Sequence, residues 1–287
     1  MKKAAIIGGG VIGGGWAARF LLNGWNVSVF DPDPEAERKI GEVLANARAA
    51  LPALSDIPMP PEGELSFAQS LTEAVESADY IQESVSERLE LKHRVFAQIQ
   101  QSCPDTLIGS STSGFKPSQL QEGAANPAMI FVAHPFNPVY LLPLAEVVPS
   151  AASDPEAIER AKEILREIGM FPLHVRKEID AHIADRFLEA VWREALWLVK
   201  DGVATTEEID EAIRMGFGLR CKDLAPFVGQ LHQHGATVAG DLHPNNQTLQ
   251  GQSVDDAGDI AVGDAQHAGQ CAHLQAILIA RERGHHV

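Results

Sequence analysis

The sequence predicts an α/β protein in which a doubly wound, mostly parallel sheet is followed by a smaller all-α domain. Three observations lead to this prediction. Short apolar runs alternate with amphipathic stretches from Lys3 to about Val175, which is typical of parallel strands joined by crossover helices. A glycine-rich turn follows the first apolar run. From about Asp180 onward, apolar residues recur at every fourth position, which indicates a helix.

The short apolar runs define the strands of the first domain. We expect them at residues 4–7, 27–31, 80–83, 106–110, 129–134, 144–148 and 173–175. The amphipathic stretches predict helices at residues 12–23, 36–51, 89–101 and 155–168. Residues 51–64 are rich in proline, so we expect an exposed irregular connection there. These elements together make a domain over residues 1–179.

A pair of helices begins the second domain, which we expect over residues 180–220. The first helix closes at Gly202, because glycine favours helix C-termini. Its apolar stripe consists of Ile183, Phe187, Val191, Ala195 and Val199. Thr205 and Glu208 have the spacing of a capping box, so a second helix should run from Thr205 to about Met215.

The last segment, residues 221–287, has a different composition. It holds seven of the eleven histidines, many glutamines and little apolar periodicity. Such a segment buries little apolar surface, so we predict poor order through much of it. Both a native segment and the product of a shifted reading frame fit this composition.

The charge of the chain excludes several partners. A net charge of −16 and a pI near 5.0 repel polyanions, so we expect neither nucleic-acid nor membrane binding, whereas a cationic ligand is attracted. The three cysteines, Cys103, Cys221 and Cys271, are too far apart to suggest a disulfide framework or a metal site. No run of about 18 apolar residues predicts a membrane span, and glycines interrupt the first apolar run, unlike a secretory signal. We therefore expect a cytoplasmic protein.

The glycine-rich turn predicts a dinucleotide site in a Rossmann-type domain. It fits the pattern G-x-G-x-x-G between a strand and a helix, the context in which the helix N-terminus binds a pyrophosphate. Its residues are Gly8, Gly9, Gly10, Val11, Ile12 and Gly13. Gly8 would permit the tight turn, Gly10 the approach of the pyrophosphate, and Gly13 close helix packing.

Asp31 indicates which dinucleotide binds. It ends the second predicted strand, where a carboxylate accepts hydrogen bonds from the ribose hydroxyls. The same carboxylate would repel a 2′-phosphate, and residues 32–35, of sequence PDPE, offer no arginine to receive one. The sequence therefore favours NAD over NADP.

Three polar residues could provide alcohol-oxidation chemistry. Ser113 follows one predicted strand, His134 ends the next, and Glu146 lies within the one after. Oxidation of a secondary alcohol needs a base for the hydroxyl proton, and histidine has a suitable pKa. Glu146 could hold the imidazole, and Ser113 could hydrogen-bond the reacting oxygen. Taken alone, a histidine at a strand end is more often structural than catalytic.

Three further motifs resemble those of the 3-hydroxyacyl-CoA dehydrogenase superfamily in order and spacing. They are GSSTS at residues 109–113, HPFNP at 134–138 and LAEVV at 144–148. The resemblance implies catalytic roles for Ser113, His134 and Glu146. The sequence ESVSE at 83–87 together with Lys92 resembles the segment beside the nicotinamide ribose, which implies that Glu87 and Lys92 contact the cofactor. A solvated helix start is the alternative for these two residues.

Within the superfamily, residues 1–220 are most similar to the L-carnitine dehydrogenases. This resemblance implies NAD-dependent oxidation of L-carnitine, a small cationic 3-hydroxyacid, by a homodimer. At position 185 this chain has an aspartate where the acyl-CoA enzymes have asparagine, and Asp185 could face the trimethylammonium group or orient His134. Asn137, Tyr140 and Trp192 are further candidates for substrate contact.

Two other functions remain open at this point. The chain could be a short-chain 3-hydroxyacyl-CoA or other 3-hydroxyacid dehydrogenase, with the same base and cofactor. It could also be an inactive NAD-binding module, because residues 221–287 do not resemble the helical continuation of the superfamily.

Overall fold

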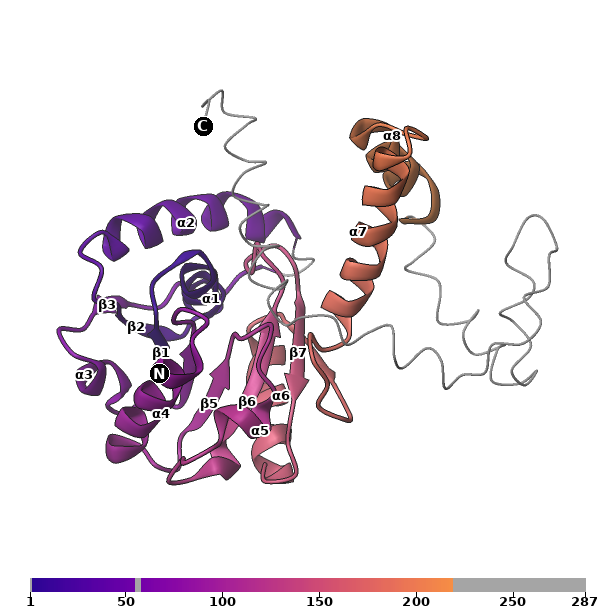
Figure 1. Cartoon of the computed structure of the whole chain (residues 1–287). Coiled ribbons are helices and arrows are strands. Elements are labelled where there is room, and N and C mark those ends of the chain that lie inside the picture. Colours follow the sequence, from indigo (N-terminus) through magenta and orange to yellow (C-terminus); the bar gives the residue numbers. More distant parts are fainter. Residues whose placement is uncertain (1, 55–57, 219–287) are drawn as a thin grey trace. The chain divides into compact units, whose positions relative to one another are not determined.

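A computed structural model describes residues 2–54 and 58–218 of the chain. It divides into two compact units, Met1–Ala190 and Val191–Val287 (Figure 1). The first unit contains the sheet and every candidate residue named above except Trp192. The segment 221–287, predicted to be poorly ordered, lies outside the described residues.

The first unit is built on an eight-stranded sheet of order β3-β2-β1-β4-β5-β6-β7-β8. Its strands are β1 (Lys3–Ile7), β2 (Asn26–Phe30), β3 (Leu65–Phe67), β4 (Tyr80–Glu83), β5 (Leu107–Ser110), β6 (Ile130–Pro135), β7 (Leu144–Val148) and β8 (Phe171–His174). Neighbouring strands are parallel except β6 and β7, which are antiparallel. The predicted doubly wound, mostly parallel sheet is confirmed. Its order reverses between β1 and β4, where such sheets bind ligands.

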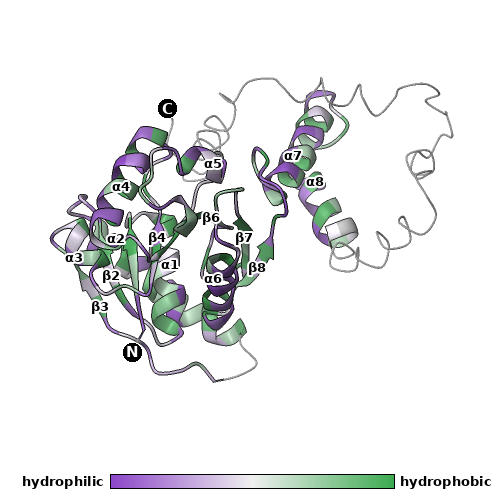
Figure 2. Ribbon diagram, turned by 90° about the horizontal axis from the view of Figure 1, so that it is seen from below, coloured by the Kyte–Doolittle hydropathy of each residue, from purple (hydrophilic) through white to green (hydrophobic). Residues whose placement is uncertain are grey.

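Helices cover both faces of this sheet. They are α1 (Val11–Leu22), α2 (Ala36–Ala50), α3 (Leu71–Val75), α4 (Leu89–Ser102), α5 (Pro117–Leu120) and α6 (Pro155–Glu167). Polar and apolar residues occupy opposite sides of α6, and the apolar side is the buried one (Figure 2). Asp154 caps its first turn by accepting a hydrogen bond from the Glu156 amide, and Gly169 ends it with a φ of 73°.

Three short elements were not predicted. They are β3, α3 and α5, of three to five residues each. Elements of this length show no hydrophobic period, and β3 pairs with β2 only. The proline-rich connection also begins with a 3₁₀ helix at Leu51–Leu54.

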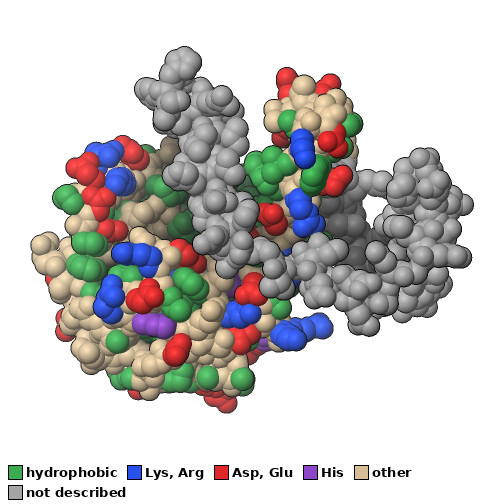
Figure 3. Space-filling model, viewed as in Figure 1, with side chains coloured by type: hydrophobic (Ala, Val, Ile, Leu, Met, Phe, Trp, Pro, Cys, Tyr) green, Lys and Arg blue, Asp and Glu red, His purple; other side chains and the backbone are tan. Residues whose placement is uncertain are grey.

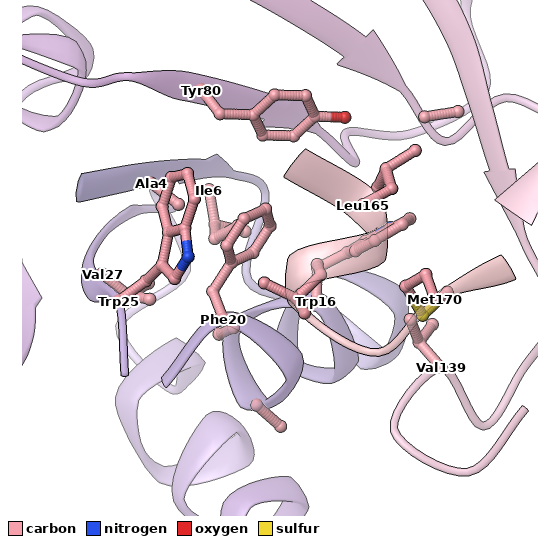
Figure 4. Packing of buried hydrophobic residues seen from close by; sticks show 14 of the residues in the cluster. Ala4, Ile6, Trp16, Phe20, Trp25, Val27, Tyr80, Val139, Leu165 and Met170 are labelled. Atoms are coloured by element: carbon pink, nitrogen blue, oxygen red, sulfur yellow. The ribbon is translucent and has the colours of Figure 1, made fainter. Parts of the chain in front are cut away.

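Alternate residues along each strand build two hydrophobic cores. Ala4 and Ile6 of β1 pack into one core, and Ala5 and Ile7 pack into the other. The first core contains an aromatic group between α1 and the sheet, in which the Phe20 ring lies 5.5 Å from that of Tyr80 (Figure 4). This packing seats α1 on the sheet, so that the helix N-terminus lies just past the end of β1.

The outer faces of the helices are charged. Figure 3 shows acidic and basic side chains interspersed over α2, where Arg38 lies 2.7 Å from Glu35 and 2.6 Å from Glu42. Such exposed pairs contribute little to stability. In the described part of the chain, no helix combines the length and apolar character needed to span a membrane.

Two further helices follow the sheet, α7 (Ala184–Lys200) and α8 (Thr206–Ala212). The predicted capping box of Thr205 and Glu208 is confirmed. Beyond α8 the chain continues as a π-helical turn, Ile213–Phe217, in which Gly216 departs from helical geometry. None of the residues of α7 is buried among the described residues, although its apolar stripe predicts a packed face.

Candidate active site

Each glycine of the loop after β1 has a different environment. Gly8 has a φ of +102°, and a Cβ there would lie 2.5 Å from the carbonyl oxygen of Ser84. A Cβ on Gly13 would lie 1.8 Å from the carbonyl oxygen of Gly8, whereas one on Gly10 would meet nothing within 4 Å. Gly8 and Gly13 therefore shape the loop, and Gly10 leaves its outer surface open to a ligand.

The first turn of α1 offers amide groups to an anion. Its N-cap, Gly10, provides no side-chain hydrogen bond, and the turn contains no acidic residue. Val11 at its start is 63% exposed. Free amides and the positive end of the helix dipole suit a phosphate group. The residues of this loop therefore fit a dinucleotide.

Asp31 lies beside the same loop and orders it. One carboxylate oxygen accepts a hydrogen bond of 2.5 Å from the Gly9 amide, and the other accepts one of 2.8 Å from the Asp33 amide. Each oxygen keeps a further lone pair that could accept from a ribose hydroxyl. Lys39 lies 2.6 Å from the Asp33 carboxylate, so this cation is already paired.

Glu87 and Lys92 belong to an ion network at the ends of β4 and β5. The Lys92 ammonium lies 2.7 Å from Glu83 and 3.3 Å from Glu87, with the Lys92 side chain 1% exposed. Glu83 also accepts a hydrogen bond from the Ser110 hydroxyl. The Thr112 hydroxyl donates to Glu87. Because the ammonium group of Lys92 faces Glu83 and Glu87, Lys92 holds these two carboxylates in place. The side chain of Glu87 is 42% exposed, so Glu87 is the member of this network within reach of a ligand.

His134 and Glu146 face each other across the one antiparallel pair of the sheet. The register of β6 and β7 sets these two residues directly opposite, so their side chains share one face. His134 Nδ1 lies 2.9 Å from Glu146 Oε2. A carboxylate can only accept, so Nδ1 carries the proton and Nε2 is left as a base.

The second Glu146 oxygen binds the start of α7. Glu146 Oε1 accepts hydrogen bonds from the amides of Ile183 (2.9 Å) and Ala184 (3.0 Å). Burial of the carboxyl opposes ionisation, but the hydrogen bonds from His134 and these two amides outweigh it and hold the pKa of Glu146 below its ordinary value. Glu146 is thus a fixed negative charge behind the imidazole.

Asp185 lies on the other side of the same ring. Its carboxylate is 3.6 Å from His134 Nε2, and its side chain is 28% exposed. Burial raises the pKa of Asp185, which His134 only partly offsets. Two carboxylates with opposite pKa shifts therefore flank one imidazole. The Glu146 carboxylate is saturated with donors, and the Asp185 carboxylate is not.

A second histidine, which the sequence did not single out, completes this cluster. His182 is fully buried, and its ring centroid lies 5.3 Å from that of His134. Ala181 and His182 both have positive φ values, of 57° and 50°. No sequence pattern predicts left-handed backbone at two consecutive non-glycine residues.

The remaining candidates form no hydrogen bond or ion pair with this cluster among the described residues. Ser113 is exposed in the turn after β5, and its hydroxyl makes no hydrogen bond to another described residue. Asn137 is exposed in the turn after β6, and Tyr140 is partly buried against the first core. Trp192 belongs to the second unit and is 39% exposed. In the described ranges, no group of His, Cys, Asp and Glu has the arrangement needed to hold a metal ion.

Two family models match the chain. Residues 3–179 match the model of the 3-hydroxyacyl-CoA dehydrogenase NAD binding domain. Residues 182–238 match the model of the 3-hydroxyacyl-CoA dehydrogenase C-terminal domain. The second match extends to residue 238, so our expectation that the resemblance to the superfamily ends at Arg220 was wrong for residues 221–238.

Similar sequences carry a more specific name. The chain is 74% identical over 228 residues to the L-carnitine dehydrogenase/betainyl-CoA thioesterase of Ruegeria pomeroyi, covering 79% of the chain and 47% of that protein. It is 54% identical over 245 residues to the L-carnitine dehydrogenase of Mesorhizobium japonicum, covering 85% and 67%. The chain thus spans about half the length of the Ruegeria protein.

Solved structures agree on the fold. The chain is similar to 5-formyl-3-hydroxy-2-methylpyridine 4-carboxylic acid 5-dehydrogenase, an NAD+-dependent dismutase, with a TM-score of 0.75, 26% identity and full coverage of both chains. It is also similar to 3-hydroxybutyryl-CoA dehydrogenase from Escherichia coli, with a TM-score of 0.64 and 27% identity, covering 74% of this chain and 46% of that one.

Proposed function

Because this chain belongs to the 3-hydroxyacyl-CoA dehydrogenase family, we propose that it oxidises L-carnitine to 3-dehydrocarnitine with NAD and that His134 is the general base. One observation carries the proposal. His134 is fixed by Glu146 at 2.9 Å through Nδ1, and its Nε2 lies 3.6 Å from a second, partly exposed carboxylate, Asp185. The NAD-binding domain of this family supplies the cofactor site.

The chemistry requires a proton acceptor and a hydride acceptor. When held by the glycine loop and Asp31, NAD would supply the acceptor for the hydride of the carbon that bears the hydroxyl. His134 Nε2 takes the hydroxyl proton, and the ionised Glu146 stabilises the imidazolium that results. We assign to the hydroxyl of Ser113, which is exposed in the turn after β5, a hydrogen bond to the reacting oxygen.

Asp185 supports a cationic substrate. In carnitine the trimethylammonium group is attached to the carbon next to the one that bears the hydroxyl. A carboxylate beside His134 Nε2 is therefore close both to the reacting hydroxyl and to the trimethylammonium group. A quaternary ammonium cannot donate an N–H hydrogen bond, so a negative charge and aromatic faces must recognise it. The net charge of −16 favours the same class of ligand.

The proposal is tested by turnover. The purified chain, mixed with NAD and L-carnitine, should produce NADH, and D-carnitine should not replace the L enantiomer. Acetoacetyl-CoA with NADH is the matched assay for a short-chain acyl-CoA enzyme. Turnover of acetoacetyl-CoA without turnover of carnitine would reject the substrate that we propose.

Substitution of Asp185 separates its two possible roles. We expect Asp185→Asn to raise KM for carnitine by about fivefold, since one partly exposed charge pair contributes roughly 1 kcal/mol. KM for an uncharged 3-hydroxyacid such as 3-hydroxybutyrate should change much less. If KM rises equally for both substrates, Asp185 serves His134 and the ammonium group is recognised elsewhere.

The inactive NAD-binding module is the second candidate. The unusual composition of residues 221–287 is the observation that favours it. NAD binding by calorimetry without turnover of any 3-hydroxyacid would support it. A homodimer in the cytoplasm remains our prediction from the family resemblance and the cysteine content, and sedimentation of the chain tests the dimer.

A further inference from the structure

His182 links two parts of the site that the mechanism uses separately. It lies in the segment before α7, and its Nε2 is 3.2 Å from the carbonyl oxygen of Thr112, in the turn after β5. Thr112 immediately precedes Ser113. The ring of His182 also lies next to the ring of His134, to which it is tilted by 50°.

The protonation state of His182 follows from its contacts. A carbonyl oxygen can only accept, so Nε2 carries a proton and donates it to Thr112. Nδ1 is buried and has no hydrogen-bond partner in the described part of the chain. Burial, and then the charge of His134, lower the pKa of His182, while the hydrogen bond to Thr112 and the charges of Glu146 and Glu87 act in the opposite direction without outweighing them. His182 is therefore a neutral donor.

The backbone around His182 is held by other contacts. Left-handed conformations at Ala181 and His182 cost on the order of 1 kcal/mol or more each. Such backbone conformations persist where neighbouring groups determine the geometry. Here the amides of the next two residues, Ile183 and Ala184, both donate to Glu146. The imidazole of His182 is thus placed by the same carboxylate that holds His134.

The turn that His182 binds is itself a hydrogen-bonded unit. Its Thr112 hydroxyl donates to Glu87 and accepts from the Phe115 amide at 3.0 Å, and the Gly114 amide donates to Glu87 at 3.2 Å. The side chain of Ser113 extends from this turn into solvent. A shift of the Thr112 carbonyl therefore moves Ser113 relative to His134.

We propose that His182 is a positioning residue, which fixes the turn bearing Ser113 relative to His134 through its hydrogen bond to the Thr112 carbonyl. The catalytic part of this statement rests on the proposed dehydrogenase function. Its structural part, the ordering of the turn by the Nε2 donor, can be measured without substrate.

Two variants isolate the hydrogen bond. His182→Phe keeps a planar ring but loses the donor. His182→Gln loses the ring but places an amide N–H where the imidazole Nε2 was. Amide hydrogen exchange at residues 112–115 should accelerate in the Phe variant and return toward the wild-type rate in the Gln variant. kcat should fall about tenfold to hundredfold in the Phe variant, since small misplacements cost that much, and recover in the Gln variant.

Three outcomes would overturn the inference. One is wild-type exchange and kcat in the Phe variant, because the ring would then only fill space. Another is equal loss in the Phe and Gln variants. If the Phe variant does not fold, the Gln variant is compared with His182→Asn, whose shorter side chain does not bring its amide to Thr112. The third outcome is then equal exchange rates and equal kcat in the Gln and Asn variants. Should the wild-type chain oxidise no 3-hydroxyacid, the proposed function fails, and the exchange rates alone decide on His182.

Discussion

The loop that fits the cofactor and the cluster around His134 are built in opposite ways. The loop occupies six consecutive residues, 8–13, and its shape depends on the absence of side chains at Gly8 and Gly13. The cluster brings together side chains from distant segments, since His182 lies 70 residues from Thr112 along the chain and Ile183 lies 37 from Glu146.

This difference predicts how the two regions respond to change. In the loop, adding one methyl group to a glycine disturbs backbone contacts directly. In the cluster, side chains meet through hydrogen bonds and ion pairs, so loss of a side chain such as His134 can remove chemistry and leave the fold intact. The predictions below test these expectations.

The largest effect is expected for His134→Ala. Removal of a general base typically costs about 10²- to 10⁴-fold in rate. Because His134 is not part of the glycine loop, the Kd of NAD, measured by calorimetry, should change little. An unchanged kcat would remove His134 from the mechanism, and a large loss of NAD affinity would show that the two regions are coupled.

A smaller effect on stability is expected for Gly13→Ala, with Gly10→Ala as its matched control. The new Cβ on residue 13 would overlap the Gly8 carbonyl, so we expect a loss of about 1–3 kcal/mol in the free energy of unfolding, as for overpacked interiors. At Gly10 the Cβ is unobstructed and φ is −68°, so stability should be retained while NAD binds more weakly. Thermal unfolding and NAD titration of both variants test this. Equal destabilisation would contradict the roles assigned to the two glycines.

The smallest effect on rate is expected for Glu146→Gln. Hydrogen bonds to charged groups contribute about 1.5–3 kcal/mol, so kcat should fall about 10- to 100-fold. A neutral amide no longer favours the protonated imidazole, so the acidic limb of the kcat/KM profile should move to lower pH. If this limb stays in place, Glu146 serves the fold alone.

The stability difference between the wild type and this variant should depend on pH. The folded-state pKa of Glu146 is lowered. Its contribution to stability is therefore present above the ordinary glutamate pKa, about 4.3, and is lost as the pH falls through the folded value. The stability difference between the wild type and the Gln variant should shrink on acidification, as measured by urea unfolding at several pH values.

The sequence by itself determined the features that depend on neighbouring residues. Short apolar runs predicted the strands that bury their side chains on both faces, and the glycine motif predicted the tight loop between β1 and α1, in which Gly13 packs against Gly8. The capping box of Thr205 was predicted for the same reason. Asp31 was predicted beside the loop, because the motif fixes the distance along the chain at which the second strand ends.

Tertiary structure alone decided how the candidate side chains meet. The antiparallel pairing of β6 and β7 sets His134 opposite Glu146, and the apolar runs of the two strands do not by themselves specify this register. The position of Asp185 at 3.6 Å from the imidazole depends on the hydrogen bonds from the start of α7 to Glu146. His182 was missed because burial and a positive φ belong to its surroundings. A residue's neighbours along the chain constrain its backbone, but its role in a site depends on groups that only folding brings within a few ångströms.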